Sequence, residues 1–257
     1  MAVAQRDLVA PSRHRLESEG DWPGWPAEVA VRLAATRLPR LMAVAIAVLL
    51  LLHVAAAIST YVFDVDTALG LIPIVRVYGE GTLPAWYSSL SLLLVSGLLL
   101  LTSRVERVAS RAARPWLVLA AVFGVLAVDE AVGFHELTTE PLRAALDTGG
   151  LLHLAWVLPA MAAVGVFVLA HVRFLVTLPR TLAVAFVVAG ACYVGGAIGM
   201  EMVDGAYLAA RGDQPDLGYD LLTGIEEGLE MLGILLLVRA LIHHIVERTT
   251  ALLVTVD

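Results

Sequence analysis

Six long runs of apolar residues dominate the pattern of hydrophobic and polar positions along the chain. A bilayer core about 30 Å thick is crossed by about 20 residues in helical form, and each run has about that length. The runs are continuous rather than alternating, which disfavours membrane β-strands. The pattern predicts an all-α, polytopic membrane helix bundle with six transmembrane helices, at 41–63, 84–103, 116–135, 151–174, 181–202 and 219–243.

Arginine is distributed unevenly between the predicted loops. Of the 17 basic residues, all arginine, fourteen lie in the N-terminal segment, the even-numbered loops and the tail, and only Arg76, Arg143 and Arg211 lie in the odd-numbered loops. Loops rich in arginine stay on the cytoplasmic side. Both termini are therefore predicted to be cytoplasmic, and the arginine-only usage favours a bacterial cytoplasmic membrane.

Composition narrows the classes of protein further. The chain is 59% hydrophobic and 16% charged, with a net charge of −7, which excludes an ordinary soluble domain and argues against a nucleic-acid partner. The lipid bilayer is the expected partner, and the oligomeric state stays open. We expect a cytoplasmic N-terminal segment with an interfacial helix (1–38), a six-helix transmembrane domain (39–247) and a cytoplasmic tail (248–257). The single cysteine, Cys192, precludes a cysteine-rich metal site.

Acidic residues lie inside three of the predicted spans, where a carboxylate costs about 3 kcal/mol on insertion scales and is usually functional. Asp129 lies thirteen residues past Trp116, about 20 Å along an outward helix, and Glu226 lies seven residues past Tyr219, about 10 Å down an inward one. In a core about 30 Å thick these depths coincide. The acids are therefore predicted to converge in the outer half of the membrane, with Glu230 deepest.

So many carboxylates in a low dielectric need protons or cations for compensation. Carboxylates with one or two imidazoles suit iron, manganese and similar ions, so we expect a divalent transition metal, with iron favoured. Four-helix di-iron sites use a similar inventory, although the usual Glu-x-x-His pair is absent here. The candidate metal ligands are Asp129, Glu130, His135, Glu136, His153, Glu201, Asp204, Glu226, Glu227 and Glu230. On a continuous third helix, His135 should point away from Asp129. No catalytic residue is assigned, and no site for an organic cofactor is expected.

Several other polar residues invite a structural interpretation. His53, in mid-span, is expected to be a packed, hydrogen-bonded histidine, whereas His243 and His244 should be interfacial and Asp220 wetted by solvent. The pairs Gly195-x-x-x-Gly199 and Gly224-x-x-x-Gly228 have the spacing that lets two helices approach closely.

Two motifs carry resemblances. The Asp129-Glu130…His135-Glu136 and Glu226-Glu227-x-x-Glu230-Met231-x-Gly233 segments resemble those of uncharacterised bacterial multi-pass membrane proteins, over spans three to six, which implies no activity. The segment 226–230 is similar to the Arg-Glu-x-x-Glu motif of oxidase-coupled iron permeases, a resemblance that implies iron binding by paired glutamates. Here Glu226 stands in place of the arginine, and there is one copy rather than two.

Two functional hypotheses follow. The first is a membrane metalloprotein, a dinuclear-metal oxidoreductase that acts on an apolar small molecule or lipid. The second is a transporter, for iron-type cations or coupled to protons, whose acids line an entry path. A gapped string of acids favours transport and a closed cluster favours catalysis. An assembly subunit whose acids pair with a partner's arginines is a third interpretation.

Overall fold

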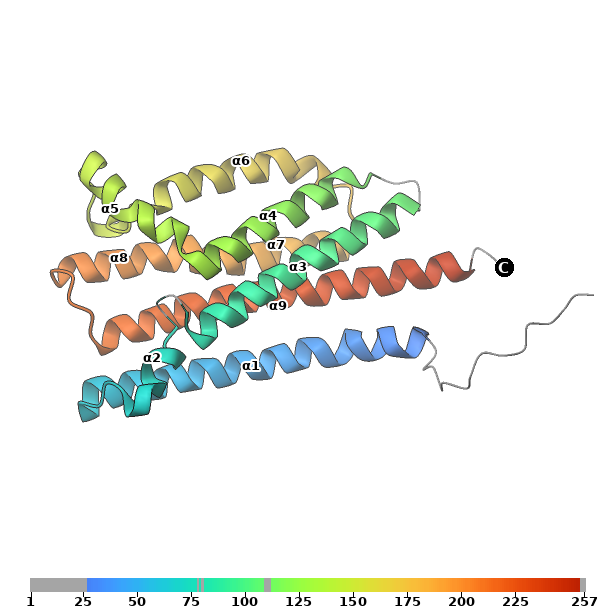
Figure 1. Ribbon diagram of the computed structural model, residues 1–257. Helices are drawn as coiled ribbons and strands as arrows, with labels where there is room; N and C mark the ends of the chain where they lie inside the picture. The colour runs from blue at the N-terminus through green and yellow to red at the C-terminus, as the bar shows by residue number, and fades with distance from the viewer. Residues whose placement is uncertain (1–26, 78, 80, 109–111, 255–257) are drawn as a thin grey trace, which may run out of the picture.

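The computed structural model describes residues 27–77, 79, 81–108 and 112–254, and it is helical throughout its regular elements (Figure 1). Most of the predicted interfacial segment lies outside these residues, and the remainder forms the start of α1, which continues through Pro39. The elements in chain order are α1 (Ala27–Phe63), η1 (Ala68–Gly70), α2 (Leu71–Val75), α3 (Leu83–Val108), α4 (Arg114–Val132), α5 (Phe134–Leu146), η2 (Gly150–Leu152), α6 (Val157–Leu175), α7 (Arg180–Val194), η3 (Gly195–Met200), α8 (Glu201–Ala210) and α9 (Leu217–Val254).

The prediction of six spans is confirmed. Within the described residues, six helices are long and apolar enough to cross a membrane: Thr36–Phe63, Leu83–Val108, Arg114–Val132, Val157–Leu175, Arg180–Ala210 and Leu217–Arg248. The fifth is the continuous run of α7, the π-helical η3 and α8. Figure 1 shows the start of α1 and the end of α9 at the same end of the bundle, with α5 and α8 at the other. Which end faces the cytoplasm stays a prediction.

Helix α9 is the centre of the bundle. It packs against α1, α3 and α7, while α3 and α4 form an antiparallel pair. The apolar core lies toward the arginine-rich end, where Leu99, Leu119 and Leu241 are at most 5% exposed. Trp116 closes this core, with its ring 5.0 Å from that of Phe174 in an edge-to-face arrangement. By contrast, only 6% of the α6 span is buried within the protein.

Two glycines of α9 confirm their predicted packing role. A Cβ at Gly224 would lie 3.1 Å from the His53 ring, and one at Gly228 would lie 3.3 Å from Leu50, so both face α1. The prediction for Gly195 and Gly199 is wrong, because neither has a neighbour within 4 Å of an added Cβ. The close approach is made by Gly196 instead, since the π-helical turn of η3 rotates a different face of the span toward α9.

Candidate functional site

The acidic segments meet at one cavity of about 540 Å³. It lies between α4, α5, α6, η3 and α9, toward the end of the bundle where α5 and α8 lie. Eight acidic residues and one histidine contribute to its wall, and no arginine or lysine of the described chain does. These residues are Asp129, Glu130, His135, Glu136, Glu140, Glu201, Glu226, Glu227 and Glu230. Eight of the ten candidate ligands are thus brought together, and His153 and Asp204 are not among the lining residues.

A turn at Gly133 creates the first part of the wall. The predicted third span ends three residues early, because Gly133 adopts a left-handed conformation (φ 66°) and its N–H caps the carbonyl of Asp129. Glycine takes this conformation without the steric cost of a Cβ. The chain then begins α5, which brings His135 back over the end of α4. The prediction that His135 points away from Asp129 is therefore wrong.

His135 and Asp129 form a hydrogen-bonded pair. The imidazole Nδ1 lies 2.7 Å from Asp129 Oδ2 and donates to it, and the His135 backbone N–H donates to Oδ1 at 3.1 Å. Burial lowers the pKa of the His135 imidazole, but the hydrogen bond to Asp129 and the charge of that carboxylate outweigh it and raise the pKa above its usual value. An imidazole held at Nδ1 keeps Nε2 for a second partner.

An aromatic side chain of the cavity wall packs against this pair. The Trp156 ring lies 4.5 Å from the His135 ring, centroid to centroid. Its indole N–H donates to Glu201 Oε1 at 2.7 Å. Sequence reasoning did not select Trp156 for the site, because a tryptophan at a helix end reads first as an interfacial anchor.

Three carboxyl groups, of Glu201, Asp204 and Glu226, lie near one another beside the cavity. Asp204 is fully buried, and neither of its oxygens accepts a hydrogen bond from an N–H or O–H donor of the described residues. The group that faces it is the carboxyl of Glu226, which also faces Glu201. Two carboxyl groups can hydrogen-bond to each other only when one carries a proton. Buried carboxyl groups this close together are stable only when a proton or a cation reduces their repulsion.

The deepest acids are placed by close helix packing. A Cβ at Gly196 would lie 2.7 Å from both the Glu226 carbonyl oxygen and Glu230 Cγ. The absence of that Cβ lets α9 approach η3, so that Glu227 and Glu230 lie at the cavity opposite Glu130. π-Helical turns are frequent at functional sites. Among the described residues, however, no three histidine, cysteine or acidic side chains are grouped closely enough, as placed, to hold one metal ion.

His153 belongs to a separate polar cluster between α5 and the loop before α9. Its Nε2 lies 2.6 Å from Arg143 Nη1 and 2.5 Å from Asp213 Oδ1. Arg143 also pairs with Glu140, one of the cavity-lining acids. The imidazole of His153 thus lies between the guanidinium of Arg143 and the carboxylate of Asp213, in a cluster that lies outside the cavity wall.

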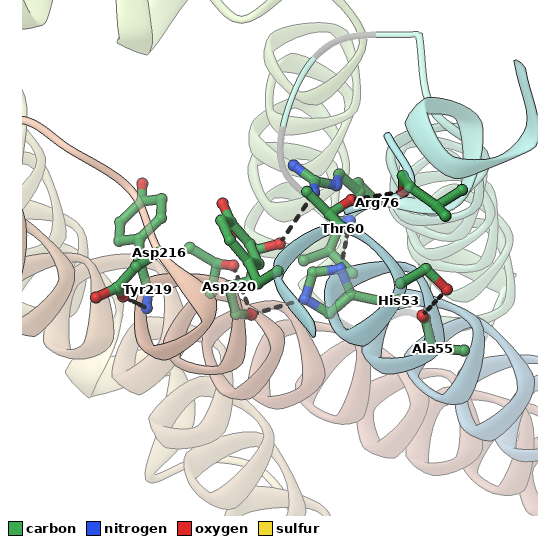
Figure 2. A network of polar contacts seen from close by, with 12 residues as sticks. His53, Ala55, Thr60, Arg76, Asp216, Tyr219 and Asp220 are labelled. Carbon is green, nitrogen blue, oxygen red and sulfur yellow. Dashed lines mark hydrogen bonds and ion pairs between the residues drawn. The ribbon is translucent and has the colours of Figure 1, made fainter. Parts of the chain in front are cut away.

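Figure 2 shows a second polar network, in which His53 of α1 and Asp220 of α9 meet Arg76. His53 accepts from the Val77 N–H at 3.2 Å and donates to the Asp220 carbonyl at 2.7 Å, which confirms its predicted packed and hydrogen-bonded state. The solvent-wetted state predicted for Asp220 is wrong, because its side chain is fully buried with Arg76 Nη2 3.7 Å from Oδ2. Tyr61 also donates to this carboxylate.

The arginine-rich end holds a third buried group. His244 Nε2 lies 3.0 Å from Glu106 Oε1, and both side chains are 5% exposed. Arg248 reaches the same oxygen at 3.1 Å, and the Trp116 ring stacks on His244. The interfacial position predicted for His244 is therefore wrong, whereas His243, one residue earlier, has a side chain that is 73% exposed.

Fold and site together define a class of protein: a multi-pass helical membrane protein with an acid-lined cavity at one end of its bundle. The chain belongs to the family described as a domain of unknown function, DUF8692, whose family model matches residues 41–245. This range includes every residue that lines the cavity. Comparison with curated proteins and with solved structures gave no match.

Proposed function

We propose that the protein is a membrane metalloprotein that holds divalent iron-type ions at the acid-lined cavity and uses them on an apolar or lipid substrate. The observation that carries the proposal is the wall itself, with eight acids, one histidine and no described arginine or lysine, although Arg143 pairs with Glu140 from outside the wall. At an effective dielectric constant of about 20, two like charges about 4 Å apart repel by about 4 kcal/mol. A divalent cation relieves this repulsion for several carboxylates at once.

The donor set matches this kind of ion. Carboxylate oxygens with imidazole nitrogen suit iron and manganese better than zinc, which favours histidine and cysteine. The Asp129–His135 pair also has the form of a metal-binding histidine oriented by a carboxylate on its other nitrogen. Glu130, Glu227 and Glu230 would hold the metal together with His135, and their side chains would have to draw closer to do so, because no three such groups of the described chain are close enough as placed. The metal would supply Lewis-acid or redox chemistry.

The rest of the cavity suits a substrate. Its volume falls within the range of about 300–1,000 Å³ that is usual for small-molecule sites. Ala160 and Val164 of α6 and Ile198 of η3 add apolar surface to the wall. The Trp156 ring, fixed by Glu201, would position an apolar molecule beside the acids. The exposed acids Glu136 and Glu140 would order water at the rim.

A dead-ended cavity favours catalysis over transport. Beyond Glu230, successive inward residues of α9 are buried in the apolar core: Met231, Ile234, Val238 and Leu241 are at most 2% exposed. No acidic residue of α9 follows Glu230 through this layer, and Arg239, the polar residue of α9 at this level, is exposed rather than part of it. The transport alternative rests on the spread of acids from the exposed rim at Glu140 to Glu230.

Elemental analysis of purified protein tests the proposal. Full-length protein, purified in detergent without chelator, should carry about one or two iron-type ions per chain, and the double variant Glu227→Gln/Glu230→Gln should lose them. The matched control is Glu247→Gln, because Glu247 lies on the same helix but at the far end of the bundle. Folded wild-type protein that retains no metal under these conditions would contradict the proposal.

A further inference from the structure

A second cavity, of about 330 Å³, lies between α7 and α9 at the arginine-rich end of the bundle. The acid-lined site does not extend to it. One part of its wall is polar, with Thr181, Arg239 and His243. The remainder is apolar, with Leu182 and Ala185 among its residues. A cavity with one polar end and one apolar end is complementary to an amphipathic ligand.

The packing of α7 on α9 fixes the depth of the polar end. A Cβ at Gly233 would lie 2.7 Å from both the Ala189 carbonyl oxygen and the Tyr193 nitrogen, so these residues are level in the two antiparallel helices. Further along α9, Arg239 is then level with about Ala185, and His243 with about Thr181. Thr181 follows the first residue of α7, where the span meets the headgroup region. Arg239 lies about 6 Å deeper, at about 1.5 Å per residue.

The positive charge of Arg239 has no carboxylate partner among the described residues. Among the described residues, the neighbouring charged groups are engaged with one another: His243 pairs with Glu247 at 3.5 Å, and His244 and Arg248 both pair with Glu106. No carboxylate of the described chain pairs with Arg239. An arginine within a membrane span is costly unless it meets an anion or extends toward the headgroups.

We propose that this cavity binds one anionic phospholipid. Its phosphate meets the Arg239 guanidinium and the Thr181 hydroxyl, and an acyl chain lies along Leu182 and Ala185. Guanidinium groups bind phosphate through two parallel hydrogen bonds, and basic pockets between membrane helices are the usual sites of anionic lipid headgroups. The apolar groove favours a lipid over free phosphate. Glu247, at the polar rim, limits the site to a single phosphate.

Native mass spectrometry of delipidated full-length protein tests this assignment. Added phosphatidylglycerol should be retained as one molecule per chain, and phosphatidylcholine with the same acyl chains should not. Arg239→Gln should weaken phosphatidylglycerol retention at least tenfold. Arg173→Gln is the matched control, because Arg173 lies at the same end of the bundle but outside the cavity, and it should leave retention unchanged. Equal retention by wild type and Arg239→Gln overturns the proposal, as does equal retention of the two lipids.

Two further arms separate a lipid from a free phosphate. Ala185→Phe fills the groove and keeps the charge, so it should reduce phosphatidylglycerol retention to the level of Arg239→Gln. Inorganic phosphate at millimolar concentration should not displace the lipid. Displacement by inorganic phosphate, with Ala185→Phe unaffected, assigns the site to a soluble phosphate and overturns the lipid proposal. Thermal unfolding of Arg239→Gln without lipid should match wild type, since Arg239 is exposed on the protein surface.

Discussion

The Nδ1 atom of His135 lies 2.7 Å from Oδ2 of Asp129, across the turn that ends α4 and begins α5. The two residues are six apart, a spacing at which side chains on one straight helix do not meet. The left-handed Gly133 makes the contact possible, because it changes the direction of the chain between α4 and α5. The imidazole is therefore fixed in direction before any ligand arrives, which is a property of pre-organised sites.

The approach of η3 to α9 should be sensitive to a single methyl group. Gly196→Ala places a Cβ where the Glu226 backbone and the Glu230 side chain now lie, each at 2.7 Å. We expect a loss of about 1–3 kcal/mol in the free energy of unfolding, as in other overpacked cores. Denaturant titration of the detergent-solubilised protein measures it.

Gly195→Ala and Gly199→Ala are matched controls, because neither added Cβ has a neighbour within 4 Å. Both should stay within about 0.5 kcal/mol of wild type. A Gly196→Ala protein as stable as these two would refute the close packing of η3 on α9, and with it the placement of the deep acids.

The buried Asp220 should depend on Arg76. Arg76→Gln leaves a fully buried carboxylate without its cation, and the loss of one partner of a buried pair costs about 3 kcal/mol. In the double variant Arg76→Gln/Asp220→Asn the loss should be smaller than the sum of the single losses, because no charge is stranded. Unfolding of all three variants in denaturant gives the comparison.

Arg211→Gln serves as the control for that series. Its partner Asp216 and Arg211 itself are 43% and 44% exposed, and exposed pairs contribute about 0–1 kcal/mol. If Arg76→Gln is no more damaging than Arg211→Gln, the network that joins α1 to α9 has no stabilising role.

Sequence reasoning succeeded where hydrophobicity alone decides. The six spans follow from the cost of placing polar backbone and side chains in lipid, and the convergence of the acids follows from counting helical rise along Asp129, Glu226 and Glu230. Both are local properties of single segments. The depth of each acidic residue could be predicted without knowing which helices are neighbours.

It failed where a single residue redirects the chain or a partner comes from far along it. Gly133 lies in an apolar run that predicts a continuous helix, so the direction of the His135 side chain was predicted wrongly. Asp220 is buried because Arg76 and Tyr61, more than 140 residues earlier, surround it. His244 is buried by Glu106 for the same reason. Such pairings follow from tertiary packing, which no pattern within one segment reports.

Membrane orientation follows from the arginine asymmetry and can be tested by cysteine labelling. In a chain with Cys192 replaced by serine, cysteines at Ala145 and Gly212 should react with an impermeant maleimide from outside the cell. A cysteine at Thr177, in the exposed turn between α6 and α7, should react only after the membrane is permeabilised. Labelling of the Thr177 position in intact cells would reverse the orientation and place the acid-lined cavity on the cytoplasmic side.

Glu230 separates catalysis from transport. It lies eleven residues along α9 from Tyr219, which is about 16 Å of helical rise from the end of the bundle at which the cavity lies. In a catalytic site it is one ligand of a resident ion, because a carboxylate at that depth is tolerated mainly when a cation neutralises it. In a transporter it is a binding site that ions occupy only briefly, because a transport site must bind the ion weakly enough to release it. Glu230→Gln keeps the shape of the side chain and removes its charge.

The two readings give opposite results in sealed liposomes. For a catalytic protein, wild type moves no iron or manganese across the membrane, and Glu230→Gln loses metal that wild type retains through purification. For a transporter, wild type shows saturable uptake that Glu230→Gln abolishes, and neither protein retains metal. We expect the catalytic result, because the buried layer of Met231, Ile234, Val238 and Leu241 closes the path below Glu230. Saturable uptake by wild type would show that this layer opens, and the acids would then be an entry path rather than a catalytic site.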